Sequence, residues 1–362
     1  TGPLPRIGPA AISLADQTLV APPVFVHITE QSWAEGTVDE TRPPVPTNWR
    51  RPEALLPPTR LLGTGRGLAD LREPALRGRE VVRDVLWRAL KDVCEDSGVR
   101  VSLLRGPSGY GKTRLAWWLS YRAHELGLAF PLMGNYEETR GPGCGVGPML
   151  ERLFSCFELE GEKRTDRIRQ RIPGMVSADH LAEFGALMSP DGTYAVDGTR
   201  VTFTNEEEKF TALLHLVQRL GERRPVLLFF DDLQWGDEAM RFVHHALTRM
   251  PRLPLHIVGT IRDDVPHSVA GVELQRLVTD CEATQQMTIG PLDDEAQAAL
   301  ITAWLPLEPG ALNALIRRSA GSPLFAAELV RHWARTGALV VTNDGFRVRD
   351  DADETLPDGL RS

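Results

Sequence analysis

The sequence predicts an α/β fold in which a parallel sheet is covered by helices on both faces. The run at 225–230 is continuously apolar, which is typical of a strand buried on both sides, and 255–260 is interpreted as another buried strand. Between such runs the apolar residues recur at helical spacing, as they do over 206–221. Because strands and helices alternate along the chain, the strands are expected to run parallel.

The individual elements follow from the same periodicities. We expect five strands, over 99–104, 128–133, 225–230, 255–260 and 286–289. We expect helices over 80–94, 114–126, 148–158, 162–171, 178–188, 206–221 and 237–249. Residues 191–204 are polar and indicate either a hairpin or a mobile loop. After residue 292 the pattern is helical to about 336, and a hairpin is expected over 338–348.

Composition shifts divide the chain into parts. Eleven of the 27 prolines lie in the first 60 residues, so residues 1–71 are interpreted as a linker or extended arm, with a wholly unstructured tail as the alternative. The α/β core is assigned to 72–292, with a helical insert at about 141–204. A small helical lid with a terminal hairpin follows over 293–350. Residues 351–362 are interpreted as a linker to a further domain, in a chain that begins with threonine and is expected to be a piece of a longer protein.

Charge and composition exclude several classes of function. A net charge of −8 argues against a protein whose main role is to coat nucleic acid. No apolar run is long enough for a membrane helix, so no membrane partner is expected. The four cysteines are scattered and the histidines are not clustered in sequence, which predicts neither a disulfide framework nor a metal site of cysteines and histidines. A reducing, cytoplasmic location is expected.

The strongest motif is a glycine-rich loop between a predicted strand and a predicted helix. It matches the phosphate-binding pattern G-x-x-x-x-G-K-[ST], in which backbone N–H groups and a helix N-terminus surround phosphate. Lys112 is expected to reach the β- and γ-phosphates of ATP, and the Thr113 hydroxyl to bind Mg²⁺. The predicted ATP or ADP site comprises Gly106, Pro107, Ser108, Gly109, Tyr110, Gly111, Lys112, Thr113 and Arg114. The fold is thus predicted to be that of a P-loop NTPase with a parallel five-stranded sheet.

An acidic pair ends the apolar run at 225–230. Asp231 is expected to hold Mg²⁺, because a carboxylate at the carboxyl end of a buried strand lies beside the phosphate loop. Asp232 is the candidate general base that polarises the attacking water. The alternative is that the pair only caps a strand before a turn.

A third candidate is Arg262, which follows the strand at 255–260 and is expected to sense the γ-phosphate. A solvated surface arginine is the alternative. A fourth motif, Gly321–Phe325, lies between two predicted helices, where its proline suits the start of the second helix.

Taken together in this order, these motifs resemble those of the signal-transduction ATPases with numerous domains, within the wider AAA-like P-loop group. The run at 76–80 is similar to the family's V-G-R-x-x-E motif, which implies that Arg79 lies near the adenine. The run at 231–237 resembles D-D-L-H-W-A-D, and 321–325 resembles G-N-P-L-F, whose proline implies that Pro323 contacts the base from the lid. The sequence departs from these patterns at Gln234, Gly236 and Ser322.

The resemblance implies an ATP-binding, slowly hydrolysing switch whose nucleotide state controls lid closure and assembly. The runs at 43–52 and 61–68 resemble linkers of bacterial serine/threonine kinase–ATPase fusions, which implies an N-terminal kinase as a partner domain. The tail at 356–362 resembles a segment that leads into a winged-helix domain, before helical repeats. The resemblance leaves the oligomeric state open, with a homo-oligomer as one alternative. Two alternatives remain open: a DNA-associated initiator-like ATPase, and a scaffold that binds ATP without hydrolysing it.

Overall fold

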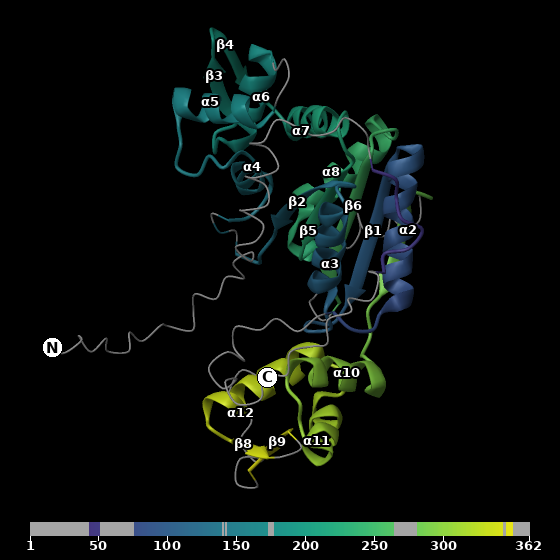
Figure 1. Cartoon of the computed structure of the whole chain (residues 1–362). Helices are drawn as coiled ribbons and strands as arrows, with labels where there is room; N and C mark the ends of the chain where they lie inside the picture. The colour runs from purple at the N-terminus through teal and green to yellow at the C-terminus, as the bar shows by residue number, and fades with distance from the viewer. Residues whose placement is uncertain are drawn as a thin grey trace, which may run out of the picture. The chain divides into compact units, whose positions relative to one another are not determined.

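A computed structural model gives the fold (Figure 1). It describes residues 43–50, 76–139, 141, 143–172, 177–263, 281–342 and 345–349. The expectations for most of the N-terminal arm and for the segment after residue 349 lie outside these residues.

The central element is a five-stranded parallel sheet in the order β2-β5-β6-β1-β7. Its strands are β1 (Val99–Gly106), β2 (Phe130–Asn135), β5 (Val226–Asp231), β6 (Leu255–Arg262) and β7 (Thr284–Thr288). All six residues of β5 are buried, as expected of a continuously apolar central strand. The predicted fold class is confirmed.

Helices cover both faces of the sheet. On one face lie α2 (Glu80–Asp96) and α3 (Lys112–Glu125), whose Leu90 and Leu119 share a buried core with Phe229 of β5. The opposite face carries α7 (Glu206–Gly221) and α8 (Asp237–Arg249). There, the ring of Phe230 meets Phe242 of α8 edge to face. Consecutive residues of β5 therefore serve two separate cores.

The insert forms a helical layer with a small hairpin. It contains α4 (Val146–Phe154), α5 (Gly161–Arg171), α6 (Ala178–Met188), β3 (Thr193–Val196) and β4 (Thr199–Thr202). The polar stretch after α6 thus forms the hairpin rather than a loop. It packs closely on α6, because a Cβ at Gly185 would lie 2.2 Å from the ring of Tyr194.

The lid consists of α10 (Asp294–Trp304), α11 (Pro309–Ser319) and α12 (Pro323–Arg335), with the hairpin β8 (Leu339–Thr342) and β9 (Gly345–Val348). It has a hydrophobic core of its own, which includes Trp304, Leu329, Trp333 and Phe346.

Some boundaries differ from the sequence prediction. Strand β2 begins at Phe130 rather than at 128, because Leu128 donates its N–H to Ala123 O and ends helix α3 instead. Helix α3 begins at Lys112 rather than at 114, directly after Gly111, the last glycine of the loop. Helix α4 ends at Phe154, where Ser155 adopts a left-handed conformation.

The segment 43–50 from the proline-rich part packs on α2 and α3. Trp49 is buried, and its Nε1 donates to Asp84 Oδ1 at 2.7 Å. The guanidinium of Arg83 lies 3.4 Å from the centre of the Trp49 ring, and Trp118 meets that ring edge to face. Arg122 Nε donates to Trp49 O at 2.9 Å. Helices α2 and α3 thus lie beneath a docked piece of chain that has no regular structure.

Among the described helices, none combines the length and the apolar character that a membrane span requires.

Candidate functional site

The site begins with the glycine-rich loop between β1 and α3. At Gly106 a Cβ would lie 2.3 Å from the carbonyl oxygen of Ile289, so only glycine lets β1 end this close to its neighbour. Gly111, with φ of 90°, precedes the first turn of α3, which contains Thr113 and Arg114. Pro107, Ser108, Gly109 and Tyr110 complete the loop. All residues predicted to bind nucleotide from 106 to 114 therefore form one continuous turn at the carboxyl edge of the sheet.

Lys112 lies beneath this loop. Its ammonium donates to Gly106 O at 2.8 Å and to Pro107 O at 2.7 Å, and the residue is only 6% exposed. The buried ammonium therefore has loop carbonyls as hydrogen-bond acceptors. A phosphate ligand would have to compete with these acceptors for the ammonium.

Asp231 is held by hydroxyl groups from two other elements. Thr113 Oγ1, from α3, donates to Asp231 Oδ1 at 2.9 Å. Thr260 Oγ1, from β6, donates to the same oxygen at 2.5 Å. Burial raises the pKa of Asp231 to about 6, and the nearby Asp232 adds to the rise, whereas the two hydroxyl hydrogen bonds oppose it. The predicted pair of Mg²⁺ ligands, Thr113 and Asp231, is thus in direct contact.

Asp232 lies just beyond the end of β5 in a left-handed conformation, with φ of 56°. Its N–H donates to Thr260 Oγ1 at 2.9 Å, and its Oδ1 accepts from Gln234 Nε2 at 3.0 Å. Gln234 lies in the short 3₁₀ turn η3 (Leu233–Trp235), and its Oε1 accepts from the N–H of Arg262 at 3.0 Å. The amide of Gln234 therefore bridges the candidate base and the end of β6.

Arg262 ends β6, where it pairs in register with Gly106 of β1. The structure thus places its backbone beside the first residue of the phosphate loop. This adjacency follows from the parallel pairing of β1 with β6, and the role of Arg262 as a γ-phosphate sensor stays a prediction.

Arg79 and Pro323 lie at the junction of core and lid. Arg79, with φ of 64°, donates through its guanidinium to Gly290 O and to Pro291 O, both in the connection between β7 and α10. Pro323 opens α12, and the next residue, Leu324, donates its N–H to Gly109 O at 3.2 Å. Arg79 therefore contacts the connection between core and lid, and Pro323 lies next to the lid residue that contacts the phosphate loop.

Two further residues of the site were absent from the sequence prediction. Thr260 contacts both aspartates, and Gln234 joins Asp232 to Arg262. Thr260 is a polar residue near the carboxyl end of a buried strand, and that is the signal that could have identified it. Gln234 is a position at which the sequence departs from the family pattern, and that departure could have singled it out.

The donor set fits a magnesium ion. Asp231 is a buried carboxylate whose pKa is raised chiefly by burial, and a bound cation would favour its charged form. Asn135, its register partner on β2, has a buried Oδ1 without a hydrogen-bond partner in the described part of the chain. Carboxylate, hydroxyl and amide oxygens are the ligands that Mg²⁺ prefers.

Comparison with a family model agrees with this geometry. Residues 75–259, about half of the chain, match the model of the AAA ATPase domain. Comparison with curated proteins gave no match. Among solved structures, the Aeropyrum pernix ORC2 protein (ADPNP-ADP complexes) has 13% identity and a TM-score of 0.45, over 78% of this chain and 68% of that one. A chain of the E. coli MS115-1 HORMA:CdnC:Trip13 complex has 14% identity and a TM-score of 0.40, over 76% and 84%. With a family model matched over the core that holds the phosphate loop and both aspartates, this chain belongs to the AAA ATPase domain family.

Proposed function

We propose that this chain is an ATP-binding and slowly hydrolysing switch module, in which the nucleotide state controls the seating of the lid. The observation that carries the proposal is the hydroxyl–carboxylate network of Thr113, Asp231 and Thr260. It joins the phosphate loop, the acidic strand end and the neighbouring strand at one point, where a hydrolytic site needs its cation.

In this proposal Thr113 and Asp231 hold Mg²⁺. When bound, the ion neutralises charge on the phosphates. The Lys112 ammonium exchanges its two loop carbonyl acceptors for phosphate oxygens. The loop therefore already holds the positive charge that contacts the phosphates.

Asp232 is the candidate general base, and Gln234 holds its carboxylate by one oxygen. This hydrogen bond orients the carboxylate and leaves its other oxygen available to accept a proton from water. The same Gln234 side chain accepts from Arg262 N–H, so the base and the candidate sensor are positioned by one amide. A movement of Arg262 on release of the γ-phosphate would therefore displace Gln234 and, through it, the Asp232 carboxylate.

Nucleotide binding is tested by isothermal calorimetry with ATP and Mg²⁺ on the full chain. Lys112→Ala should weaken binding by at least about tenfold, because it removes a charge-assisted contact to phosphate. Lys163→Ala is the matched control, because Lys163 is an exposed lysine of α5. Equal affinity for the wild-type chain and Lys112→Ala would contradict the proposal.

Hydrolysis is tested separately by phosphate release. Asp232→Asn should abolish release while leaving ATP affinity within a few-fold of wild type. A wild-type chain that binds ATP but releases no phosphate would instead be the non-hydrolysing scaffold. Tight, salt-sensitive binding to duplex DNA would favour the initiator-like alternative.

A further inference from the structure

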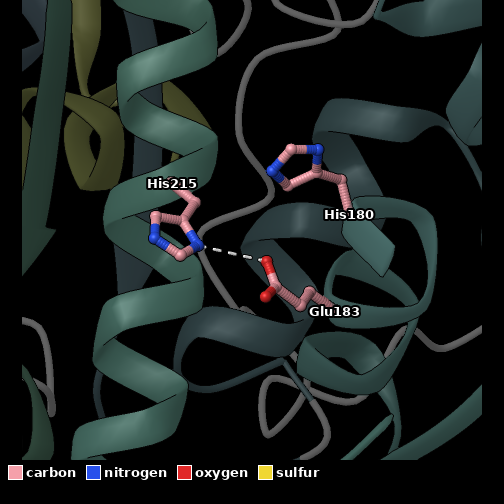
Figure 2. A group of neighbouring side chains, drawn as sticks. All are labelled: His180, Glu183 and His215. Atoms are coloured by element: carbon pink, nitrogen blue, oxygen red, sulfur yellow. Dashed lines mark hydrogen bonds and ion pairs between the residues drawn. The ribbon is translucent and has the colours of Figure 1, made fainter. Parts of the chain in front are cut away.

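Two histidines and a glutamate meet between helices α6 and α7, on the insert side of the core. His180 and Glu183 come from α6 and His215 comes from α7 (Figure 2). One donor atom from each residue lies within 4.8 Å of the other two. Within the described residues, no other group of three or more such side chains comes this close together.

The spacing along α6 explains part of this convergence. His180 and Glu183 are three residues apart on α6, so both side chains project from the same face of the helix. His215 enters from α7, and its Nδ1 lies 3.2 Å from Glu183 Oε2. Bonds of 2.0–2.1 Å in a tetrahedral zinc site separate neighbouring donor atoms by about 3.3 Å. The carboxylate and one imidazole are therefore already at the separation of two ligands.

The imidazole of His180 is oriented by a neighbour. Its Nδ1 lies 3.0 Å from Ser177 Oγ, which leaves Nε2 for a ligand. Figure 2 shows a ring nitrogen of His180 directed toward the side on which Glu183 and His215 lie. In metal sites, a ligating histidine commonly has its second nitrogen held in this way by a polar partner.

The side chains are accessible enough for an ion to enter. The side chains of Glu183 and His215 are 24% and 37% exposed, and His180 is also partly exposed. Partial exposure leaves room for water to complete the coordination, and it lets the side chains rotate to close the remaining gaps.

We propose that His180, Glu183 and His215 bind a divalent transition-metal ion of the zinc class, which joins the insert to helix α7. Two imidazole nitrogens and one carboxylate suit Zn²⁺ and its neighbours, whereas Mg²⁺ and Ca²⁺ prefer ligand sets made only of oxygen. The ion would fix α6, and with it the hairpin that packs on α6, against the helix that precedes strand β5. The ordinary structural alternative is an ion pair of Glu183 with His215, with His180 stacked on Phe184.

The site shares no residue with the proposed nucleotide site, so each proposal can fail without the other. The test uses the full chain, freed of metal by a chelator and titrated with Zn²⁺ in the absence of nucleotide. We expect uptake of one equivalent, unaffected by millimolar Mg²⁺. With Co²⁺ as a spectroscopic probe, visible absorption should report nitrogen ligands.

Three substitutions test the ligands: His180→Ala, Glu183→Gln and His215→Ala. Each should weaken Zn²⁺ binding by at least about tenfold, because the loss of even an outer partner of a ligand costs 10–100-fold. His244→Ala is the matched control, because His244 is an exposed histidine of α8. It should retain wild-type affinity.

Circular dichroism checks that each variant is folded. If an alanine variant unfolds, Glu183→Gln carries the test, because glutamine keeps the size of the side chain and can still hydrogen-bond His215. A wild-type chain that takes up no stoichiometric Zn²⁺ would overturn the proposal, as would folded ligand variants that bind Zn²⁺ as tightly as His244→Ala. The ion-pair alternative would then account for the cluster.

Discussion

Thr260 connects both aspartates of the candidate site to β6. Its hydroxyl donates to Asp231 and accepts from the N–H of Asp232. One side chain therefore satisfies a buried carboxylate and a backbone donor together.

Replacing Thr260 with valine should impair the site at neutral pH. The change removes a hydrogen bond that lowers the pKa of Asp231, so this pKa should rise above about 6 and the carboxylate should be partly protonated near pH 7. Leaving the Asp232 N–H without its acceptor should cost about 1–3 kcal/mol of folding free energy. We expect Mg²⁺-dependent ATP affinity to fall about tenfold at pH 7 and to recover in part at pH 8.5.

Thr260→Ser is the matched control, because it keeps the hydroxyl. Calorimetry at both pH values measures the affinity, and urea unfolding measures the stability. Identical behaviour of the valine and serine variants would show that the hydroxyl does not support Asp231.

His256 should make folding stability depend on pH. Burial lowers its pKa to about 3, with a further contribution from Arg100, against 6.5 in the unfolded chain. Because the folded-state pKa is depressed, the stabilisation from neutral His256 is complete above about pH 6.5 and is lost as the pH falls toward 3. The loss approaches about 1.4 kcal/mol per pH unit.

Asp231 titrates in an overlapping range with the opposite sign, because its folded-state pKa is raised. The measurement is therefore the difference in unfolding free energy between the wild-type chain and His256→Gln. The variant should become more stable relative to the wild-type chain as the pH falls from 6.5 to 4.5. A difference that stays constant over this range would show that His256 is not held neutral.

The sequence predicted the site residues that lie within a contiguous motif. It did not predict those whose role depends on contacts between separate elements. The phosphate loop lies within eight consecutive residues, and Asp231 ends an apolar run, so both were recognisable. Thr260 and Gln234 act through partners about 30 residues away or in another element. The cluster of His180, Glu183 and His215 was missed for the same reason, although the i, i+3 pair on a predicted helix was a visible signal.

At the scale of elements, long amphipathic helices were the most predictable. Helix α7 spans the predicted range because its apolar residues recur at helical spacing over four turns. Asn205 caps its N-terminus, since the Asn205 Oδ1 accepts a hydrogen bond from Glu208 N–H. Strand β2 was less well placed, since the apolar residues before it pack at the end of α3. Apolarity alone does not distinguish the end of a helix from the start of a strand.

The segment 43–50 was predicted only as part of a linker, yet it carries a stabilising anchor. Trp49→Ala should destabilise the chain by about 3 kcal/mol, because it removes a buried aromatic ring with its cation–π and edge-to-face partners. Urea unfolding measures the effect.

The neighbouring Arg50→Ala serves as the control. Arg50 is exposed, and its ion pair with Asp84 spans 3.6 Å between side chains that are both about half exposed, so less than about 1 kcal/mol is expected. Equal losses for the two variants would mean that Trp49 does not anchor the segment.

At the scale of the whole molecule, core and lid are tightly packed where they meet at Gly321. Gly321, with φ of 79°, accepts from Leu292 N–H through its carbonyl at 2.9 Å. A Cβ there would lie 2.4 Å from Pro291 Cβ and 2.7 Å from Leu292 O. The joint thus requires glycine for both its conformation and its space.

Gly321→Ala should destabilise the chain by more than the 1–2 kcal/mol expected from a left-handed conformation alone. Gly337→Ala provides that reference, because Gly337 has φ of 70° and open space around its Cα. Gly310→Ala, in the first turn of α11 with open space, should be neutral or stabilising by about 0.5 kcal/mol. Urea unfolding of the three variants should rank them in this order, and equal losses at Gly321 and Gly337 would rule out the steric term.

The hydrogen bond from Leu324 N–H to Gly109 O has a thermodynamic consequence. Gly109 lies in the loop proposed to bind phosphate, and its carbonyl also accepts the hydrogen bond from the first turn of α12. Phosphate binding and lid closure therefore involve the same peptide group. If phosphate reorients that peptide and changes the free energy of seating the lid, then by linkage the seated lid changes ATP affinity by the same factor. Anything that pulls on the lid from elsewhere would then adjust nucleotide affinity, and the module would work as a two-way transducer.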